Sequence, residues 1–282
     1  MWKKSFQQEL SGEGTEFGYS ASPIIADGRV YLPIGGPQAS IVAIGLPDGN
    51  VAWKSGNGPA SYCSMLPISR SGHPLLVGYL QNELVILDRT TGKELWKSRI
   101  SGGYDEHSAM PIDFDPLVIV SAPFQAGSTA YRIEWHEGSA NPLRVEQAWQ
   151  QTQLSLDVDS ATRIADVIFG FDLRDPQSKA HRPSRGTYRA LDANTGEVLW
   201  SSDTIGQANA VAVGNEMILL NDAGELIRAS VDRHQIHESW RLKVFEDEVT
   251  WTPPALASGI VIVRSHQRAV AIRVGEPNPL DS

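Results

Sequence analysis

The chain has little of what most often marks a covalent, metallic or membrane-bound protein. Its 282 residues contain one cysteine, Cys63, so an internal disulfide, a four-cysteine zinc site and an iron–sulfur cluster are excluded. No apolar run reaches the roughly 18 residues of a membrane-spanning helix. Basic residues number 24 against 33 acidic ones, so we expect no nucleic-acid partner and no adsorption to anionic lipid.

A targeting sequence is also missing. The first ten residues, MWKKSFQQEL, are too polar for a secretory signal. The protein is therefore either cytoplasmic, or exported with a targeting peptide that this numbering does not include. The sequence alone leaves both locations open.

What the chain does contain is a repeat. Three stretches, AIGLPDGNVAW (43–53), ILDRTTGKELW (86–96) and ALDANTGEVLW (190–200), share an apolar run, a polar turn, and a glycine four residues before a tryptophan. In the second and third stretches, Asp and Thr side chains can bond nearby backbone N–H groups, and the glycine tolerates a positive φ. Each stretch therefore predicts a β-hairpin, and two strand signals upstream extend it to four short strands.

Weaker copies complete a series in which marker tryptophans recur every 40 to 53 residues. Units of this length without helix patterns predict an all-β fold, a β-propeller of six four-stranded blades in a single domain over 1–282. The blades are expected at 16–55, 60–100, 105–151, 158–203, 206–244 and 248–275. A ring of seven or eight blades, a truncated ring, or an all-β sandwich are the alternatives.

The last unit ends before its tryptophan, whereas Trp2 has no unit before it. We therefore expect residues 1–7 to form an outer strand that completes the last blade and removes two exposed sheet edges. Each marker tryptophan is expected to pack against the neighbouring blade and to place its N–H on a carbonyl, rather than to stack a sugar or a base. The predicted structural positions of the repeat are Trp2, Trp53, Asp88, Gly92, Trp96, Trp149, Asp192, Gly196, Trp200 and Trp240.

The best copy has Ala190, Asp192, Thr195, Gly196 and Trp200 at fixed spacing, and it resembles the tryptophan-docking repeat of pyrroloquinoline-quinone-like (PQQ-like) propellers. That family includes quinoprotein dehydrogenases, which hold the quinone and calcium at the propeller axis. It also includes non-catalytic scaffolds, such as the lipoprotein of the β-barrel assembly machinery. The resemblance implies a bacterial periplasmic or cell-envelope location.

The quinone chemistry itself is not expected. The dehydrogenases use a vicinal cysteine pair over the cofactor, and here Cys63 stands alone. No segment matches their calcium ligands or catalytic Asp residue by residue. His234 and His237 form a two-residue pair without a third ligand nearby, so no metal site is predicted either. We therefore predict no cofactor, with PQQ and calcium as the alternative.

The candidate site lies just before the innermost strand of each blade, where propeller loops surround the axis. Those segments are rich in Tyr, Ser and acidic residues, which a packed core does not require. They predict an axial funnel that binds a ligand or a protein segment; the alternative is a set of solvated loops that cap neighbouring blades. The proposed funnel residues are Tyr19, Tyr62, Tyr104, Glu106, His107, Glu248 and Trp251.

No catalytic residue is assigned, because Glu106 and His107 form an acid–base pair without a nucleophile pattern. A basic insertion at 172–186 offers a second candidate surface, for an acidic partner or a phosphate. The expected function is a monomeric, non-catalytic scaffold that binds a protein partner or a small ligand at a propeller face. An atypical PQQ- and calcium-dependent oxidoreductase and a carbohydrate-binding propeller are the alternatives.

Overall fold

The structure is a computed structural model that describes residues 1–100, 107–175 and 182–275. The regular secondary structure of the described residues is β-strand, apart from one helix, α1 (Phe6–Leu10). Two compact units make up the chain, residues 1–150 and 151–282. Each unit has its own sheets and hydrophobic clusters, and the single domain expected over 1–282 stays a prediction. No helix among the described residues is long and apolar enough to cross a membrane.

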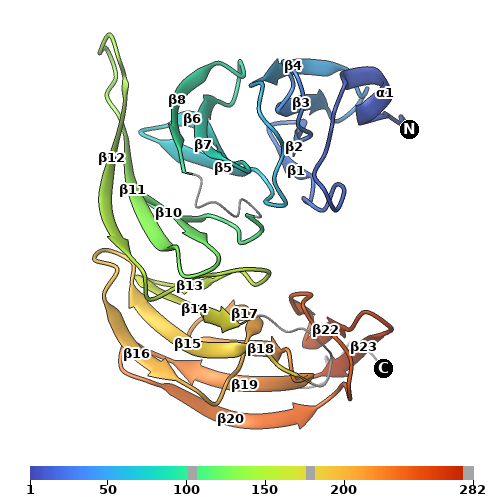
Figure 1. Ribbon diagram of the computed structural model, residues 1–282, viewed down its shortest axis with the longest axis vertical. Helices are drawn as coiled ribbons and strands as arrows, with labels where there is room; N and C mark the ends of the chain where they lie inside the picture. The colour runs from blue at the N-terminus through green and yellow to red at the C-terminus, as the bar shows by residue number, and fades with distance from the viewer. Residues whose placement is uncertain (101–106, 176–181, 276–282) are drawn as a thin grey trace. The chain divides into compact units, whose positions relative to one another are not determined.

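The first unit contains three antiparallel sheets of four strands each (Figure 1). Within each sheet, strands that follow one another in sequence lie side by side, as short turns between strands require. The strands are β1 (Ile24–Ala26), β2 (Arg29–Pro33), β3 (Ile41–Gly45) and β4 (Val51–Ser55); β5 (Leu66–Arg70), β6 (His73–Tyr79), β7 (Glu83–Asp88) and β8 (Glu94–Arg99); and β9 (Ile112–Phe114), β10 (Leu117–Ala122), β11 (Gly127–Trp135) and β12 (Leu143–Gln151).

The second unit continues the same pattern with two four-stranded sheets and a sheet of three described strands. We number the six sheets one to six in chain order. Their strands are β13 (Thr162–Ile164), β14 (Val167–Asp175), β15 (Arg185–Asp192) and β16 (Val198–Ser202); β17 (Ala208–Val213), β18 (Glu216–Asn221), β19 (Glu225–Val231) and β20 (Ile236–Lys243); and β21 (Ala255–Ala257), β22 (Ile260–Arg264) and β23 (Ala269–Arg273). The predicted strand order of the repeat is thus confirmed.

Hydrophobic clusters lie between consecutive sheets within each unit. Tyr31 and Ile41 of sheet one share a cluster with Leu76 of sheet two, and Val77 of sheet two shares another with Val118 of sheet three. In the second unit, buried side chains of sheets four and five pack together in the same way, as do those of sheets five and six. Apolar residues on both faces of the middle strands explain their nearly continuous burial.

The repeat tryptophans connect one sheet to the next. The Trp53 indole N–H on β4 donates to the Arg89 carbonyl in the β7–β8 turn, at 3.2 Å, and Trp53 is only 9% exposed. Its ring lies against Gly92, where an added Cβ would stand 2.5 Å from the Trp53 ring. Gly92 also has φ of +75°, so both its backbone and its missing side chain serve this contact.

The aspartates of the turns cap the backbone as predicted. Asp88 accepts hydrogen bonds from the N–H and the hydroxyl of Thr91, at 2.8 and 2.9 Å. Asp192 accepts from the N–H of Asn194 at 2.8 Å. These carboxylates are therefore structural, in agreement with the sequence analysis.

In the second unit a repeat tryptophan makes the same kind of contact with a different turn. The Trp200 indole N–H donates to the Asp232 carbonyl at 3.0 Å, in a β19–β20 turn that has no glycine.

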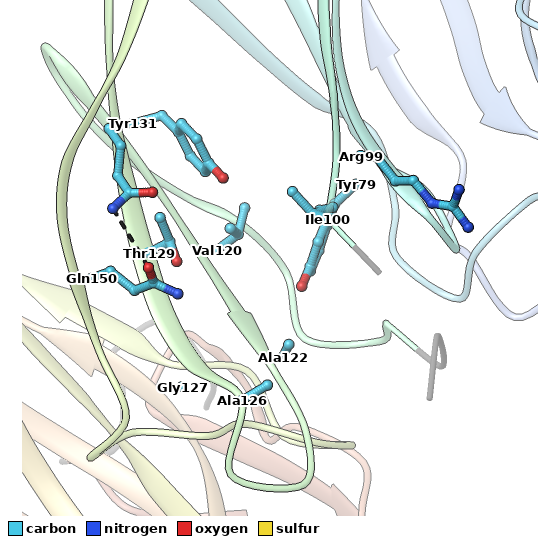
Figure 2. A pocket seen from close by; sticks show the side chains of 11 residues that line it. Tyr79, Arg99, Ile100, Val120, Ala122, Ala126, Gly127, Thr129, Tyr131 and Gln150 are labelled. Carbon is cyan, nitrogen blue, oxygen red and sulfur yellow. Dashed lines mark hydrogen bonds between the residues drawn. The ribbon is translucent and has the colours of Figure 1, made fainter. Parts of the chain in front are cut away.

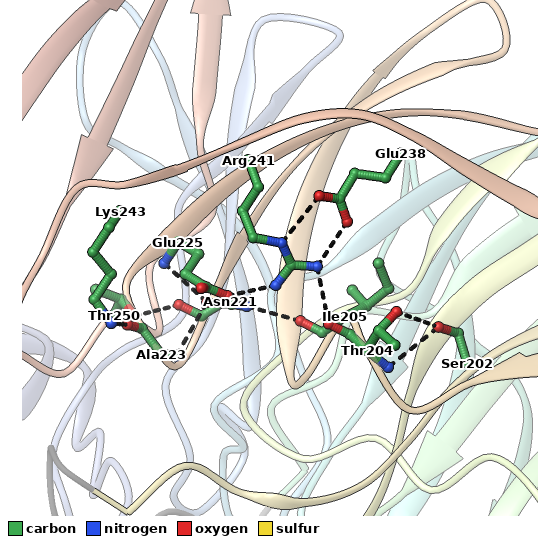
Figure 3. Close-up of polar contacts among 10 residues, drawn as sticks. All are labelled: Ser202, Thr204, Ile205, Asn221, Ala223, Glu225, Glu238, Arg241, Lys243 and Thr250. Atoms are coloured by element: carbon green, nitrogen blue, oxygen red, sulfur yellow. Dashed lines mark hydrogen bonds and ion pairs between the residues drawn. The ribbon is translucent and has the colours of Figure 1, made fainter.

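Arg241 of β20 is the centre of a polar network. It donates to Glu225 at 2.6 Å, to Glu238 at 2.7 Å, and to the Thr204 carbonyl at 3.0 Å (Figure 3). Arg241 thereby joins sheet five to the segment that follows β16.

The first residues differ from the prediction. In place of an outer strand at 1–7, the chain is irregular up to Ser5 and then forms α1. Ser5 caps this helix: its hydroxyl accepts from the Gln8 N–H at 3.3 Å, and its own N–H donates to Glu9 at 2.8 Å. Trp2 donates its indole N–H to the Leu46 carbonyl of sheet one at 2.8 Å. The predicted outer strand at 1–7 was therefore wrong, although the indole N–H of Trp2 bonds a carbonyl as expected.

Candidate functional site

Two of the predicted funnel residues lie together in the first unit. The Tyr62 N–H donates to the His107 carbonyl at 3.1 Å, which links the segment before β5 to the segment before β9. The Tyr62 hydroxyl accepts from the Phe17 N–H at 3.3 Å, and the two rings lie 6.2 Å apart. Phe17 is 74% exposed, so these two rings form an aromatic surface on the loops, which we call the Phe17–Tyr62 patch.

His107 is not a solvent-facing acid or base. It is 1% exposed, and its ring stacks on Tyr79 with centroids 4.1 Å apart and an interplanar angle of 9°. Its Nδ1 lies 2.9 Å from the Leu80 carbonyl, so His107 ties its own segment to the end of β6. Its predicted neighbours Tyr104 and Glu106 lie outside the described residues.

Tyr19 contacts the N-terminal segment and sheet one. Its hydroxyl donates to the Ile34 carbonyl at 3.3 Å, and its ring meets Phe6 of α1 edge-on at 5.8 Å. Partial burial, followed by the charge of Glu13, raises the pKa of Tyr19. Tyr19 therefore helps to hold α1 in place, while remaining 42% exposed.

In the second unit, Glu248 is nearly buried and Trp251 is partly exposed. Glu248, 9% exposed, accepts hydrogen bonds from the Ser265 hydroxyl and, at 3.0 Å, from the Arg268 guanidinium; these bonds lower its pKa. The Trp251 ring is 44% exposed, and its carbonyl accepts from the Asn209 amide at 2.8 Å. Because the predicted residues are divided between the two units, their convergence on one funnel stays a prediction.

Sequence reasoning did not identify the residues that connect sheets beneath these loops. The Ser22 N–H donates to the Ser64 hydroxyl at 2.8 Å, and the Ser160 N–H donates to the Asn209 amide oxygen at 3.0 Å. The Cys63 thiol points to the Ala109 carbonyl at 3.0 Å, and burial raises the pKa of Cys63. A polar residue just before the first strand of each repeat was the available signal. These contacts support the capping interpretation of the loops.

A buried polar chain in the second unit was also missed. The Gln207 amide donates to Asp159 at 2.7 Å, the Ser184 hydroxyl bonds the Gln207 amide oxygen, and the Ser184 N–H donates to Asp222. Asp159 and Asp222 are 1% and 2% exposed. Burial raises the pKa of Asp159 to about 7 and also raises that of Asp222. No spacing in the sequence brings 159, 184, 207 and 222 together.

The basic insertion is largely neutralised where it is described. Arg174 and Arg189 both pair with the buried Asp172, at 2.7 and 3.3 Å, and Arg185 pairs with Asp175. Arg182 is described and exposed, and residues 179 and 181 lie outside the described ranges. The described part of the β14–β15 hairpin therefore offers few unpaired cations to an acidic partner.

The described residues do not fit a calcium-dependent quinone site. Within 1–100, 107–175 and 182–275, no group of three or more His, Cys, Asp or Glu side chains is placed to hold one metal ion. Calcium takes about six to eight oxygen ligands, several of them from carboxylates.

One cavity lies wholly within the first unit, between sheets two and three (Figure 2). Its volume is about 290 Å³. Ile100, Val120, Ala122, Ala126 and Gly127 form its apolar part, and the polar part contains Tyr79, Thr129, Tyr131, Gln147 and Gln150, with Arg99 at one side. We call it the inter-sheet cavity.

A wider apolar groove of about 630 Å³ lies in the second unit, between sheets five and six. Val211, Val213, Ile218, Leu256 and Val274 line it, and Arg228 and Glu216 form an ion pair of 2.9 Å at its side. Among its described lining residues, Glu216 is the one acidic side chain.

Comparison with known proteins agrees with this architecture. The family model described as outer membrane protein assembly factor BamB matches residues 1–170. The crystal structure of BamB from Moraxella catarrhalis superposes with a TM-score of 0.61 at 17% identity, covering 90% of this chain and 69% of that protein. No curated protein matches the sequence.

Two further structures show how widely the fold occurs. Quinohemoprotein alcohol dehydrogenase from Comamonas testosteroni matches with a TM-score of 0.58 at 13% identity, covering 87% of this chain and 51% of that protein. The β-propeller domain of Cps50 (Swd1) from Myceliophteria thermophila matches with a TM-score of 0.52 at 12% identity, covering 90% and 85%. The chain thus spans about half the length of the dehydrogenase. At these identities the matches show the β-propeller fold alone.

Proposed function

The chain belongs to the family of the outer membrane protein assembly factor BamB, and we propose that it acts as a non-catalytic scaffold that binds a protein partner at the cell envelope. The observation that carries this proposal is the Phe17–Tyr62 patch. Phe17 is 74% exposed on a loop that Tyr62 holds by a hydrogen bond to its backbone. Aromatic side chains are enriched at protein interfaces, and Tyr and Trp are among the residues that most often dominate the binding energy.

The burial and pairing of the candidate polar residues favour binding over catalysis. His107 is stacked and buried, and Glu248 is paired with Arg268 and Ser265. A general acid or base must reach a substrate proton, and neither group faces solvent for that purpose. By contrast, Phe17 is 74% exposed.

A photo-crosslinking amino acid at Phe17, introduced in cells, tests the proposal. We expect it to trap a defined envelope protein, whereas the same group at Leu242, an exposed apolar residue on β20, should not. The purified partner is then titrated calorimetrically. Phe17→Ala should weaken its affinity at least about tenfold, as truncation of an interface aromatic does, and Leu242→Ala should leave it unchanged.

Two results would contradict the proposal. One is equal crosslinking at Phe17 and Leu242, which would indicate random collision. The other is reduction of an artificial electron acceptor with simple alcohols or sugars after addition of PQQ and calcium, which would favour the oxidoreductase alternative.

A further inference from the structure

We propose that the inter-sheet cavity of the first unit binds a single uncharged sugar ring. This inference is independent of the protein partner proposed above, because the cavity lies between strands of sheets two and three. Its volume of about 290 Å³ is just below the range for ligand pockets, about 300–1,000 Å³. That size suits one ring rather than a chain of sugars.

The cavity exists because small residues replace large ones at one end of the β10–β11 hairpin. Along the face that meets sheet two, Val118 lies opposite Tyr131 and Val120 lies opposite Thr129. The next pair in the same register is Ala122 and Gly127, whose side chains cannot fill the space between the sheets. The space is therefore specified by the sequence at these positions.

The walls of the cavity match the two kinds of surface on a sugar. Val120, Ala122 and Ile100 provide apolar area for the C–H face of a ring. Thr129 and Tyr131 provide hydroxyls, and the carboxamides of Gln147 and Gln150 lie within 3.5 Å of each other at the rim. Hydroxyl and amide groups both donate and accept hydrogen bonds, as the hydroxyls of a sugar do.

Charge on the ligand is disfavoured. Among the described residues that line the cavity there is no Asp or Glu to pair with a cation. Arg99 contributes the one guanidinium, which extends away from Thr129 and Tyr131 in Figure 2. A cation would lose hydration without gaining a carboxylate among these residues, and an anion would have to lie away from the hydroxyls to reach Arg99. An apolar ligand would leave the hydroxyls of Thr129 and Tyr131 without a ligand partner.

Calorimetric titration of the whole purified chain tests the inference. The probes are glucose and N-acetylglucosamine as uncharged sugars, glucuronate and glucosamine as charged ones, and benzyl alcohol as an apolar ligand. We expect at least one uncharged sugar to bind saturably, at least about tenfold more tightly than the charged and apolar probes.

Three variants locate the binding. Thr129→Val and Gln150→Leu each remove hydrogen-bonding atoms and should weaken the sugar about tenfold; Ala126→Leu should fill the cavity and abolish binding. Gln7→Leu, at an exposed position on α1, is the matched control and should bind as the wild type does. Melting curves confirm that each variant is folded.

The inference fails if neither uncharged sugar binds below about 50 mM. It also fails if a charged or apolar probe binds more tightly than both sugars, or if all three cavity variants bind as the wild type does. None of these results bears on the crosslinking at Phe17, so this proposal and the scaffold proposal can fail separately.

Discussion

Trp53 contacts sheet two in the same way as Trp200 contacts sheet five, but the turns that the two indoles contact differ. Trp53 rests on a glycine in a turn capped by Asp88, and it is nearly buried. Trp200 donates to a turn without glycine and remains partly exposed. There, Arg233 bonds both Asp166 and Asp192 from within that turn.

The difference shows which part of the repeat is essential to the fold. The indole and the carbonyl that accepts its N–H are present in both contacts, whereas the glycine is not. A close indole–turn contact requires glycine, but a looser one can be held by arginine ion pairs around it. The two turns therefore accept an indole N–H with different side-chain chemistry, a glycine in one and arginine ion pairs in the other.

Removing the two indoles separately should show the largest effect. Trp53→Ala should lower the free energy of unfolding by about 3–5 kcal/mol, because a nearly buried aromatic is lost. Trp200→Ala should cost only about 2 kcal/mol, because its ring keeps part of its contact with water. Urea unfolding of both variants measures the difference, and equal losses would contradict the comparison.

The polar chain beneath sheets four and five should make stability depend on pH. The native pKa of Asp159 is raised to about 7, above its unfolded value of about 3.9. Its contribution is thus fully present below the unfolded pKa and is lost as the pH rises through about 7. Between pH 5 and pH 8 this loss should be about 2–3 kcal/mol, and it should disappear in Asp159→Asn.

Unfolding by urea at both pH values measures the slope for each protein. Asp203→Asn, at an exposed position near the end of β16, is the control and should keep the wild-type slope. If Asp159→Asn and the wild type lose stability equally, then the buried carboxyl does not hold its proton in the native state.

A comparison of substitutions at two glycines of sheet two separates the cost of backbone strain from the cost of losing the indole contact. Gly92 and Gly72 have φ of +75° and +78°, but a Cβ would meet Trp53 at Gly92 and nothing within 4 Å at Gly72. Gly92→Ala should therefore cost about 2–3 kcal/mol, and Gly72→Ala about 1 kcal/mol. Melting temperatures that fall equally would show that the indole moves aside without cost.

The Arg241 network should give the smallest effect. Arg241→Met should cost about 1–2 kcal/mol at neutral pH, because Glu225 and Glu238 lose a partner that is about one quarter exposed. Burial alone would raise the pKa of Glu225, but Asn221 and Arg241 lower it overall; Arg241 also lowers the pKa of Glu238.

Because the pKa values of Glu225 and Glu238 are lowered, the network should stabilise the protein less at acid pH. A lowered native pKa contributes stability above the unfolded value, about 4.3, which is lost as the pH falls through the native one. The difference between Arg241→Met and the wild type should therefore shrink near pH 3. Arg144→Met removes an exposed pair with Glu146 and should leave the free energy of unfolding almost unchanged. A similar cost for both variants would contradict the role of the network.

The strands and turns were predictable because their signals are local. Alternating apolar residues, a capping Asp and a glycine at fixed spacing specify a hairpin within about 12 residues, and copies of the pattern mark one another. The N-terminal helix has a local signal of the same kind, because Ser5 is an N-cap residue and Glu9 accepts from its backbone N–H. The indole N–H of Trp2 bonds a carbonyl, as expected.

The site was less predictable because its residues have meaning only in three dimensions. The sequence placed Tyr62 and His107 in equivalent loop positions, and the structure joins them through a backbone hydrogen bond. It could not show that His107 stacks on Tyr79, since that contact joins a loop to a strand 28 residues earlier. The inter-sheet cavity depends likewise on a register that pairs Ala122 with Gly127.

Hydrophobic alternation and turn chemistry, both properties of neighbouring residues, were sufficient to define the sheets, their strand order and the repeated indole. Which polar groups are buried, which are paired and where space remains depended on packing between sheets. Burial changes the free energy of a carboxyl or an imidazole by several kcal/mol, and no local pattern records it. Asp159 shows the distinction: its neighbours in sequence suggest an ordinary loop aspartate, whereas burial in the folded chain raises its pKa to about 7.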